Sequence, residues 1–237
     1  MKLIQLKQVL DNKRFLLFTI FIPVAWYVFL YNIQQGVTPN IMLGIAVFIG
    51  IIGNSLATFS KRISSNIDFY SFESKFSKYT VKNYLLDQTL VQLVLNTLIF
   101  IVVLAVGVLF FSFPLNSQLV VQFFLLTIMG IYFSIIGFVI GVRLDEKIID
   151  TVSFPVIILA SMTIIPFASL GAEGGFMEFI GKAQMIFPGY YYTNIVNSLT
   201  TSTSIDVKDV ALFIGVFILN VIPLYFLVPK VKLATVK

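Results

Sequence analysis

Four long stretches of this chain contain no charged residue, and they decide what kind of fold it can adopt. They cover residues 41–59, 90–113, 119–142 and 210–228. Each comes close to or exceeds the roughly 20 apolar residues that a helix needs to cross a bilayer. A hydrophobic content of 58%, a charged content of 11% and a mean hydropathy of +0.97 exclude an ordinary soluble fold. The chain is therefore expected to be an all-α integral membrane protein.

The apolar runs predict six transmembrane helices within one transmembrane domain, residues 1–237. The expected spans are 15–31, 41–59, 84–113, 119–142, 148–170 and 210–228. Pro155 and Pro166 are expected to bend the fifth span. Asp150, near its start, is expected at the interface, because a carboxylate at mid-span costs about 2.5 to 3.5 kcal/mol.

Two further segments are expected at the membrane surfaces. Residues 1–14 place apolar and polar side chains in helical register, which predicts an interfacial helix. Residues 171–209 are too polar to span and too apolar for a free loop, so we expect a re-entrant outer hairpin of two short helices between spans five and six. The turn of this hairpin is predicted at Pro188 and Gly189, followed by Tyr190.

The distribution of basic residues predicts the orientation. If the N-terminus is cytoplasmic, that side holds fourteen of the 16 Lys and Arg, and the other side holds Lys182 and Lys208. The positive-inside rule then predicts a multi-pass protein of the cell membrane with both termini in the cytoplasm. The distribution of the basic residues that give the net charge of +5 is better explained by membrane orientation than by nucleic acid binding. Membrane lipid is therefore an expected partner, and nucleic acid is not.

Residues 60–83 are the only long charged interruption between apolar runs, and they predict a short amphipathic helix on the cytoplasmic side. Aromatic residues at steps of three and four form one stripe on such a helix, flanked by two acids. A partner protein must cover this stripe, unless the helix merely lies among the lipid headgroups. The stripe and its acids are Asp68, Phe69, Phe72, Glu73, Phe76 and Tyr79. A second, shorter cytoplasmic loop contains Arg143, Asp145, Glu146 and Lys147.

Several kinds of chemistry are disfavoured by residues that the chain lacks. It has no Cys and no His, which argues against thiol or imidazole catalysis and Cys/His metal sites. It has no P-loop motif, so it is not expected to bind ATP or any other cofactor itself. The uncharged span interiors argue against an ion-driven carrier. An intramembrane enzyme is disfavoured because only scattered Ser residues would serve it.

Amide side chains are the polar groups inside the expected spans. Each of them either lines a substrate pathway or hydrogen-bonds to a neighbouring helix, and we weigh the packing role ahead. Gln92 and Asn96 are four residues apart and share a helix face, which makes them the best pair for a pathway. The full set of pathway candidates is Asn54, Gln92, Asn96 and Gln122.

The layout resembles the membrane (permease) subunit of ABC-2-type ATP-driven exporters over essentially the whole chain. In that family the first cytoplasmic loop carries a coupling helix with Gly-Thr, a Glu and a Thr-Pro-Ile-Ser-like ending. Here Glu73 matches the acid and Thr80-Val81-Lys82 falls at the ending, whereas Tyr70-Ser71 replaces Gly-Thr and Tyr79 replaces Pro. Phe187-Pro188-Gly189-Tyr190-Tyr191 is similar to the family's Leu-Pro-x-Thr-Tyr stretch before the last span.

The resemblance implies a non-catalytic subunit that pairs with a second permease copy, identical or related, on two ATP-binding cassette ATPase subunits. Those subunits would bind ATP and Mg²⁺, and their closure would push on residues 68–79. The Phe-rich spans favour a hydrophobic or amphipathic cargo, and the chain is similar to small Gram-positive peptide exporters, including those for phenol-soluble modulin toxins. The alternative is a membrane receptor or immunity protein that binds a peptide without transporting it.

Overall fold

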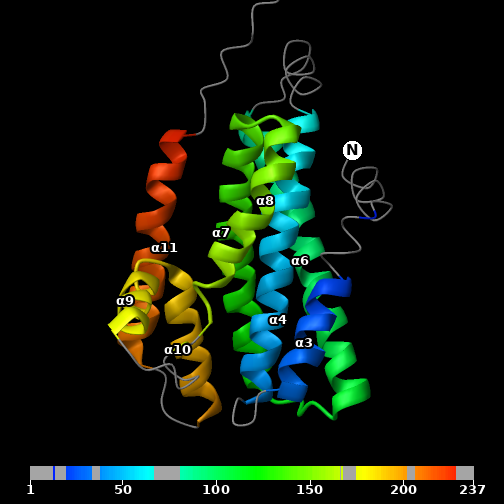
Figure 1. The fold of residues 1–237 in the computed structure, drawn as a ribbon, viewed down its shortest axis with the longest axis vertical. Coiled ribbons are helices and arrows are strands. Elements are labelled where there is room, and N and C mark those ends of the chain that lie inside the picture. Colours follow the sequence, from blue (N-terminus) through cyan, green and yellow to red (C-terminus); the bar gives the residue numbers. More distant parts are fainter. Residues whose placement is uncertain are drawn as a thin grey trace, which may run out of the picture.

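The protein folds into helices throughout the part of the chain that can be described. The computed structural model describes residues 13, 20–33, 38–66, 81–165, 167, 175–201 and 206–227. Within these ranges there are eight α-helices and one π-helical segment, and no strand (Figure 1). The expected all-α fold is confirmed.

Four described helices are long and apolar enough to cross a membrane, as expected of a multi-pass membrane protein. The first of them, residues 39–66, consists of α4 (Pro39–Gly53), the π-helical segment η2 (Asn54–Phe59) and a helical continuation to Asn66. The other three are α6 (Val81–Phe111), α7 (Gln118–Arg143) and α11 (Val207–Leu227). Each α-helix among these three agrees with its predicted span, 84–113, 119–142 or 210–228, to within three residues at both ends.

The expected first and fifth spans do not form spanning helices among the described residues. Helix α3 (Ile22–Ile33) covers most of the described part of the expected span 15–31, and residues 15–19 lie outside the described ranges. In place of 148–170, α8 (Glu146–Ser161) has 16 residues and is followed by turns at 162–164. A residue before proline disfavours the helical region, so Ile165 cannot readily continue α8 towards Pro166. The described residues therefore show four candidate spans, and they do not show six.

The second and third expected boundaries also need correction. The helix of the second span does not stop at Phe59 but continues to Asn66. Helix α6 begins three residues before residue 84 and ends at Phe111. Its end is closed by Ser112, which has a positive φ of 51°, and by a hydrogen bond from the Phe113 amide to the Gly107 carbonyl of 3.1 Å. A residue with a positive φ directly after the last helical residue ends many helices.

Two short helices occupy the segment expected to form the re-entrant hairpin. They are α9 (Gly175–Gln184) and α10 (Pro188–Thr200), and α10 lies beside α11 (Figure 1). The turn between them comprises residues 185–187, so Pro188 begins α10 rather than forming the turn. Proline suits the first helical position because its φ is already helical and it has no amide hydrogen to satisfy. The expected interfacial helix 1–14 lies outside the described residues except for Lys13.

Helix α4 and segment η2 form the centre of the bundle. Every residue from 42 to 60 is buried, and α4 contacts α3, α6, α7, α8 and α10 (Figure 1). Helix α7 approaches η2 closely because it carries Gly137 and Gly141 at the contact. A side chain at either position would collide with the backbone carbonyl of Ser55 or Ser60. Small residues of this kind allow membrane helices to pack backbone against backbone.

Candidate functional site

All four candidate pathway amides lie buried between helices. Asn54, Gln92, Asn96 and Gln122 are each at most 4% exposed. They divide into two separate groups, one on η2 and α6 and the other at the start of α4 and α7. The two groups differ in how well their hydrogen bonds are satisfied.

The first group, which we term the inner amide cluster, comprises Asn54, Ser55, Gln92 and Asn96. The Gln92 amide nitrogen donates to the Ser55 hydroxyl at 3.4 Å and to the Asn96 amide oxygen at 3.3 Å. The Asn54 amide nitrogen reaches the same Asn96 oxygen at 3.5 Å. These distances are long for N–H···O bonds, which centre near 2.9 to 3.0 Å. Within the described part of the chain, the Asn54 oxygen, the Gln92 oxygen and the Asn96 nitrogen have no hydrogen-bond partner.

The inner amide cluster is the deep part of a longer polar column. Thr58 and Gln88 continue it towards one end of the bundle. No residue that the structure describes forms a hydrogen bond with the Thr58 hydroxyl or the Gln88 amide oxygen. Residues four apart lie on the same side of a helix, which brings these groups into line. The column comprises Asn54, Thr58 and Arg62 on one helix, and Tyr84, Gln88, Gln92 and Asn96 on α6. The four-residue spacing on α6 was visible in the sequence, although Tyr84 and Gln88 were not predicted as pathway residues.

The second group, the Gln122 cluster, joins three helices with shorter bonds. The Gln122 amide nitrogen donates to the Asn40 backbone carbonyl at 2.8 Å and to the Tyr192 hydroxyl at 3.2 Å. The Asn40 side chain donates in turn to the Gln122 oxygen at 3.4 Å. Gly44 provides the space for this contact, because a Cβ there would lie 2.7 Å from the Gln122 nitrogen. The arrangement is that of a packing contact between α4, α7 and α10.

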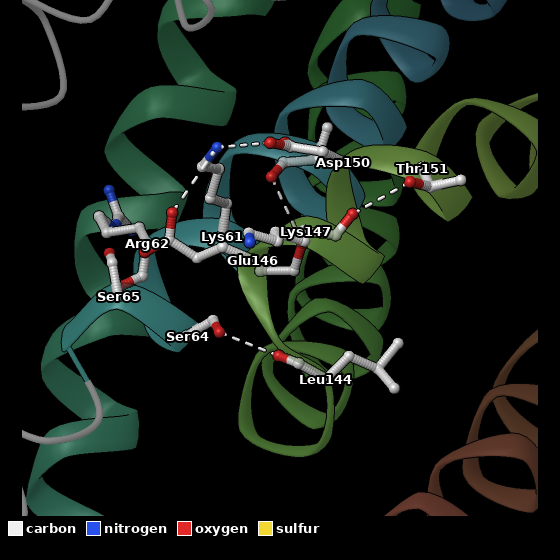
Figure 2. Close-up of polar contacts among 11 residues, drawn as sticks. Lys61, Arg62, Ser64, Ser65, Leu144, Glu146, Lys147, Asp150 and Thr151 are labelled. Atoms are coloured by element: carbon white, nitrogen blue, oxygen red, sulfur yellow. Dashed lines mark hydrogen bonds and ion pairs between the residues drawn. The ribbon is translucent and has the colours of Figure 1, made fainter.

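At the far end of the column, residues that follow η2 contact the second predicted loop (Figure 2). The Lys61 ammonium lies 2.7 Å from an Asp150 carboxylate oxygen and 3.7 Å from a Glu146 oxygen. The Ser64 hydroxyl donates to the Leu144 carbonyl at 2.9 Å. The described ends of the two predicted cytoplasmic loops, 60–83 and 143–147, therefore meet at one end of the bundle.

The other residues of the second loop lie at the same end. Asp145 immediately precedes α8, and the Lys147 carbonyl accepts a hydrogen bond from the Thr151 hydroxyl at 3.0 Å (Figure 2). The Arg143 side chain donates to the Leu227 carbonyl at the end of α11, at 2.8 Å. The residues predicted to couple to an ATPase lie outside the described part of the chain: Asp68, Phe69, Phe72, Glu73, Phe76 and Tyr79.

The predicted hairpin turn packs on the end of α8. Pro188 and Gly189 are buried and Tyr190 is half-buried. A Cβ at Gly189 would lie 2.9 Å from the Thr163 hydroxyl and 3.2 Å from the Thr163 carbonyl, so a larger residue would require the turn after α8 to shift. The Thr193 hydroxyl donates to the Ile164 carbonyl at 2.9 Å, which satisfies a backbone group left open where α8 ends.

These features define the class of the molecule as an all-helical, multi-pass membrane protein. Within the described ranges, no three His, Cys, Asp or Glu side chains gather as metal ligands would. No protein-family model, curated protein or solved structure matches this chain.

Proposed function

We propose that this chain is the transmembrane subunit of an ATP-binding cassette exporter of the ABC-2 type. It would cross the membrane six times, with both termini in the cytoplasm, and move a hydrophobic or amphipathic peptide outward. ATP and Mg²⁺ would be bound by two separate ATPase subunits that dock on residues 60–83 and 143–147. The observation that most supports the proposal is the contact between these two regions through the Ser64 hydroxyl and the Leu144 carbonyl, at 2.9 Å. Beside it, Lys61 is paired with Asp150 on the adjoining helix α8, at 2.7 Å.

The position of residues 60–66 suits them to transmit a push to the rest of the bundle. They continue directly from η2 and α4, the helix that contacts five others. A force on the adjoining segment would therefore act on the central helix rather than on a peripheral one. Through Lys61 and Ser64 the same force would reach α8 and the loop before it.

The polar column is the proposed route for the cargo. Five of its uncharged side chains each have one buried polar atom without a hydrogen-bond partner: Asn54, Thr58, Gln88, Gln92 and Asn96. An unsatisfied buried polar group costs about 1 to 3 kcal/mol, so this column is unfavourable while it stays closed. Separation of η2 from α6 would let water or the amides of a peptide pair with these atoms. The unsatisfied polar atoms would thus lower the cost of separating η2 from α6.

The exposed apolar helices provide the surfaces for lipid and for a second permease copy. Only 6% of the apolar window of α11 is buried, compared with 94% for the helix of residues 39–66. A soluble monomer does not expose apolar surface on this scale. In the proposed dimer, such faces contact either the bilayer or the partner.

The test uses inverted vesicles that contain the chain and a candidate ATP-binding cassette ATPase. Uptake of a labelled amphipathic peptide should require ATP, and uptake per ATP hydrolysed should fall about fivefold in K61E, a loss of roughly 1 kcal/mol of coupling. The double variant K61E/D150K should recover because the ion pair is restored with reversed charges. Peptide binding that is unaffected by nucleotide in every variant would instead identify a receptor or immunity protein.

The matched control is the ion pair of α9. Lys182 and Glu178 also approach to 2.7 Å, but they are about 70% exposed and lie on a different helix. K182E should leave both peptide uptake and ATP hydrolysis unchanged. An equal loss in K182E would show that the effect of K61E is one of charge alone.

A further inference from the structure

Arg62 carries a buried positive charge for which the described part of the chain provides no acceptor. All three guanidinium nitrogens are buried, and none has a hydrogen-bond partner among the described residues. Its recorded contact is with the ring of Phe59, 5.1 Å from the guanidinium carbon to the ring centre. A guanidinium stays charged in proteins and has five N–H donors to satisfy. A cation–π contact satisfies none of those donors fully.

The other cations whose side chains are described at this end of the bundle are accounted for, and Lys147 among them is exposed to solvent. Lys61 is paired with Asp150 and Glu146, and Arg143 donates to the Leu227 carbonyl. In Figure 2 the Arg62 side chain extends to the opposite side from Asp150. Among the cations described at this end, Arg62 is therefore the buried one without an acceptor, and an external anion can provide it. A buried charge without a counter-ion is strongly unfavourable, and an anion that reaches it recovers that cost.

The depth of Arg62 indicates which anion this is. Pro39 begins the same continuous helix, and 23 residues at 1.5 Å each separate the two by about 35 Å. The hydrocarbon core of a bilayer is about 30 Å thick, so a helix that starts at one face places Arg62 among the headgroups of the other. Phosphate is the anionic group that lipids present at this level. A planar guanidinium binds phosphate through two parallel hydrogen bonds.

We infer that Arg62 binds the phosphate of a membrane lipid headgroup at this end of the bundle. The surrounding side chains favour such a bond because they exclude water. Phe59, Ile63, Tyr84 and Phe138 form an apolar cluster at this point, and Val142 packs against it. In a site of low dielectric constant, charge-assisted hydrogen bonds are stronger than in water. Lipid binding at Arg62 is independent of whether the chain transports a peptide, so the two proposals fail separately.

The experiment follows the thermal unfolding of the full chain in dodecyl maltoside, a detergent without phosphate. Three additives are titrated: phosphatidylglycerol, diacylglycerol with the same acyl chains, and inorganic phosphate. Phosphatidylglycerol should raise the unfolding temperature in a saturable way, and the other two should not. Equal stabilisation by diacylglycerol would overturn the phosphate site. Arg62-dependent stabilisation by inorganic phosphate alone would overturn the assignment to a lipid.

Variants locate the effect on the guanidinium. R62Q should weaken the apparent affinity for phosphatidylglycerol about ten- to a hundredfold, the value of hydrogen bonds to a charged group. R143Q, which removes the same charge at the same end of the bundle, should bind as the parent does. If R62Q does not fold, R62K decides, because it keeps the charge but loses the two-point geometry and should bind about tenfold more weakly. Parental affinity in R62Q, or in R62K where R62Q does not fold, would refute the site.

Discussion

The helix of residues 39–66 and helix α11 are both apolar enough to cross a membrane, yet they have opposite environments. The apolar window of the first is 94% buried within the protein, and that of α11 only 6%. The buried helix carries Asn54, Ser55 and Thr58, whereas the one amide of α11 is Asn220. Lipid solvates an apolar side chain as well as a protein core does, so apolar character alone gives a helix no reason to be central. Polar side chains and small residues provide that reason.

The largest difference between the two helices should appear when a glycine is enlarged. In G137V the new side chain meets the Ser55 carbonyl, and such overpacking against backbone costs about 3 kcal/mol or more. In G215V on α11 nothing lies within 4 Å of the new Cβ. Yield of folded protein and unfolding temperature in detergent should fall sharply for G137V alone. Similar losses in both variants would mean that α11 is packed as closely as η2.

A smaller but still large difference is expected for leucine truncation. Leu43 on α4 is fully buried, so L43A should lower the free energy of unfolding by about 2 to 5 kcal/mol. Leu219 on α11 is 66% exposed, and L219A should change it by less than about 0.5 kcal/mol. Both are measured by unfolding of the purified chain in detergent. A large effect of L219A would indicate that a second copy covers α11 under those conditions.

Unfolding in detergent should also distinguish the short hydrogen bonds of the Gln122 cluster from the longer ones of the inner amide cluster. Q122L removes bonds as short as 2.8 Å and takes away the acceptor of the Asn40 side-chain nitrogen, so a loss of about 1 to 2 kcal/mol is expected. Q92L removes bonds of 3.3 to 3.4 Å together with an oxygen that has no partner. Its stability should stay within about 0.5 kcal/mol of the parent, while any peptide transport is lost. Equal destabilisation by Q122L and Q92L would contradict the description of the inner amide cluster as under-satisfied.

The smallest expected effect concerns the amide of α11. Asn220 donates to the Ile186 carbonyl in the turn before α10, at 2.9 Å. Hydrogen bonds between membrane helices average about 0.6 kcal/mol, so N220L should cost roughly that amount. Unfolding in detergent measures it against L219A, its neighbour in sequence. A loss above that of Q122L would place α11 among the structurally central helices.

The sequence predicted the long helices well because a run of twenty uncharged residues leaves few alternatives in a membrane. Helices α6, α7 and α11 accordingly follow their predicted spans closely. The helix expected over 148–170 ends at Ser161, because apolar composition alone does not register the effect of Pro166 on the residue before it. The second helix extends past its expected end at Phe59 to Asn66, because the charges of Lys61 and Arg62 mark the membrane surface without ending the helix.

Relations between helices could not be predicted from this one sequence. The partners of Gln122 are Asn40 and Tyr192, about 80 and 70 residues away along the chain. Lys61 and Arg62 are adjacent in the sequence, which does not show that Lys61 pairs with two acids while no acid among the described residues pairs with Arg62. That distinction arises only when α8 is placed beside the end of the central helix.

The wide π-helical turn of η2 also determines the direction in which the side chains of residues 60–66 point from the helix axis. A π-helical turn accommodates one residue more than an α-helical turn, which offsets the subsequent side chains by one position, or about 100°. With a regular α-helix over residues 54–59, Ser60 would face the acids of α8, and Lys61 would point where Arg62 now points. A single widened turn at mid-helix thus determines that Lys61 forms an ion pair with α8, whereas the adjacent Arg62 faces away from the acids of that helix.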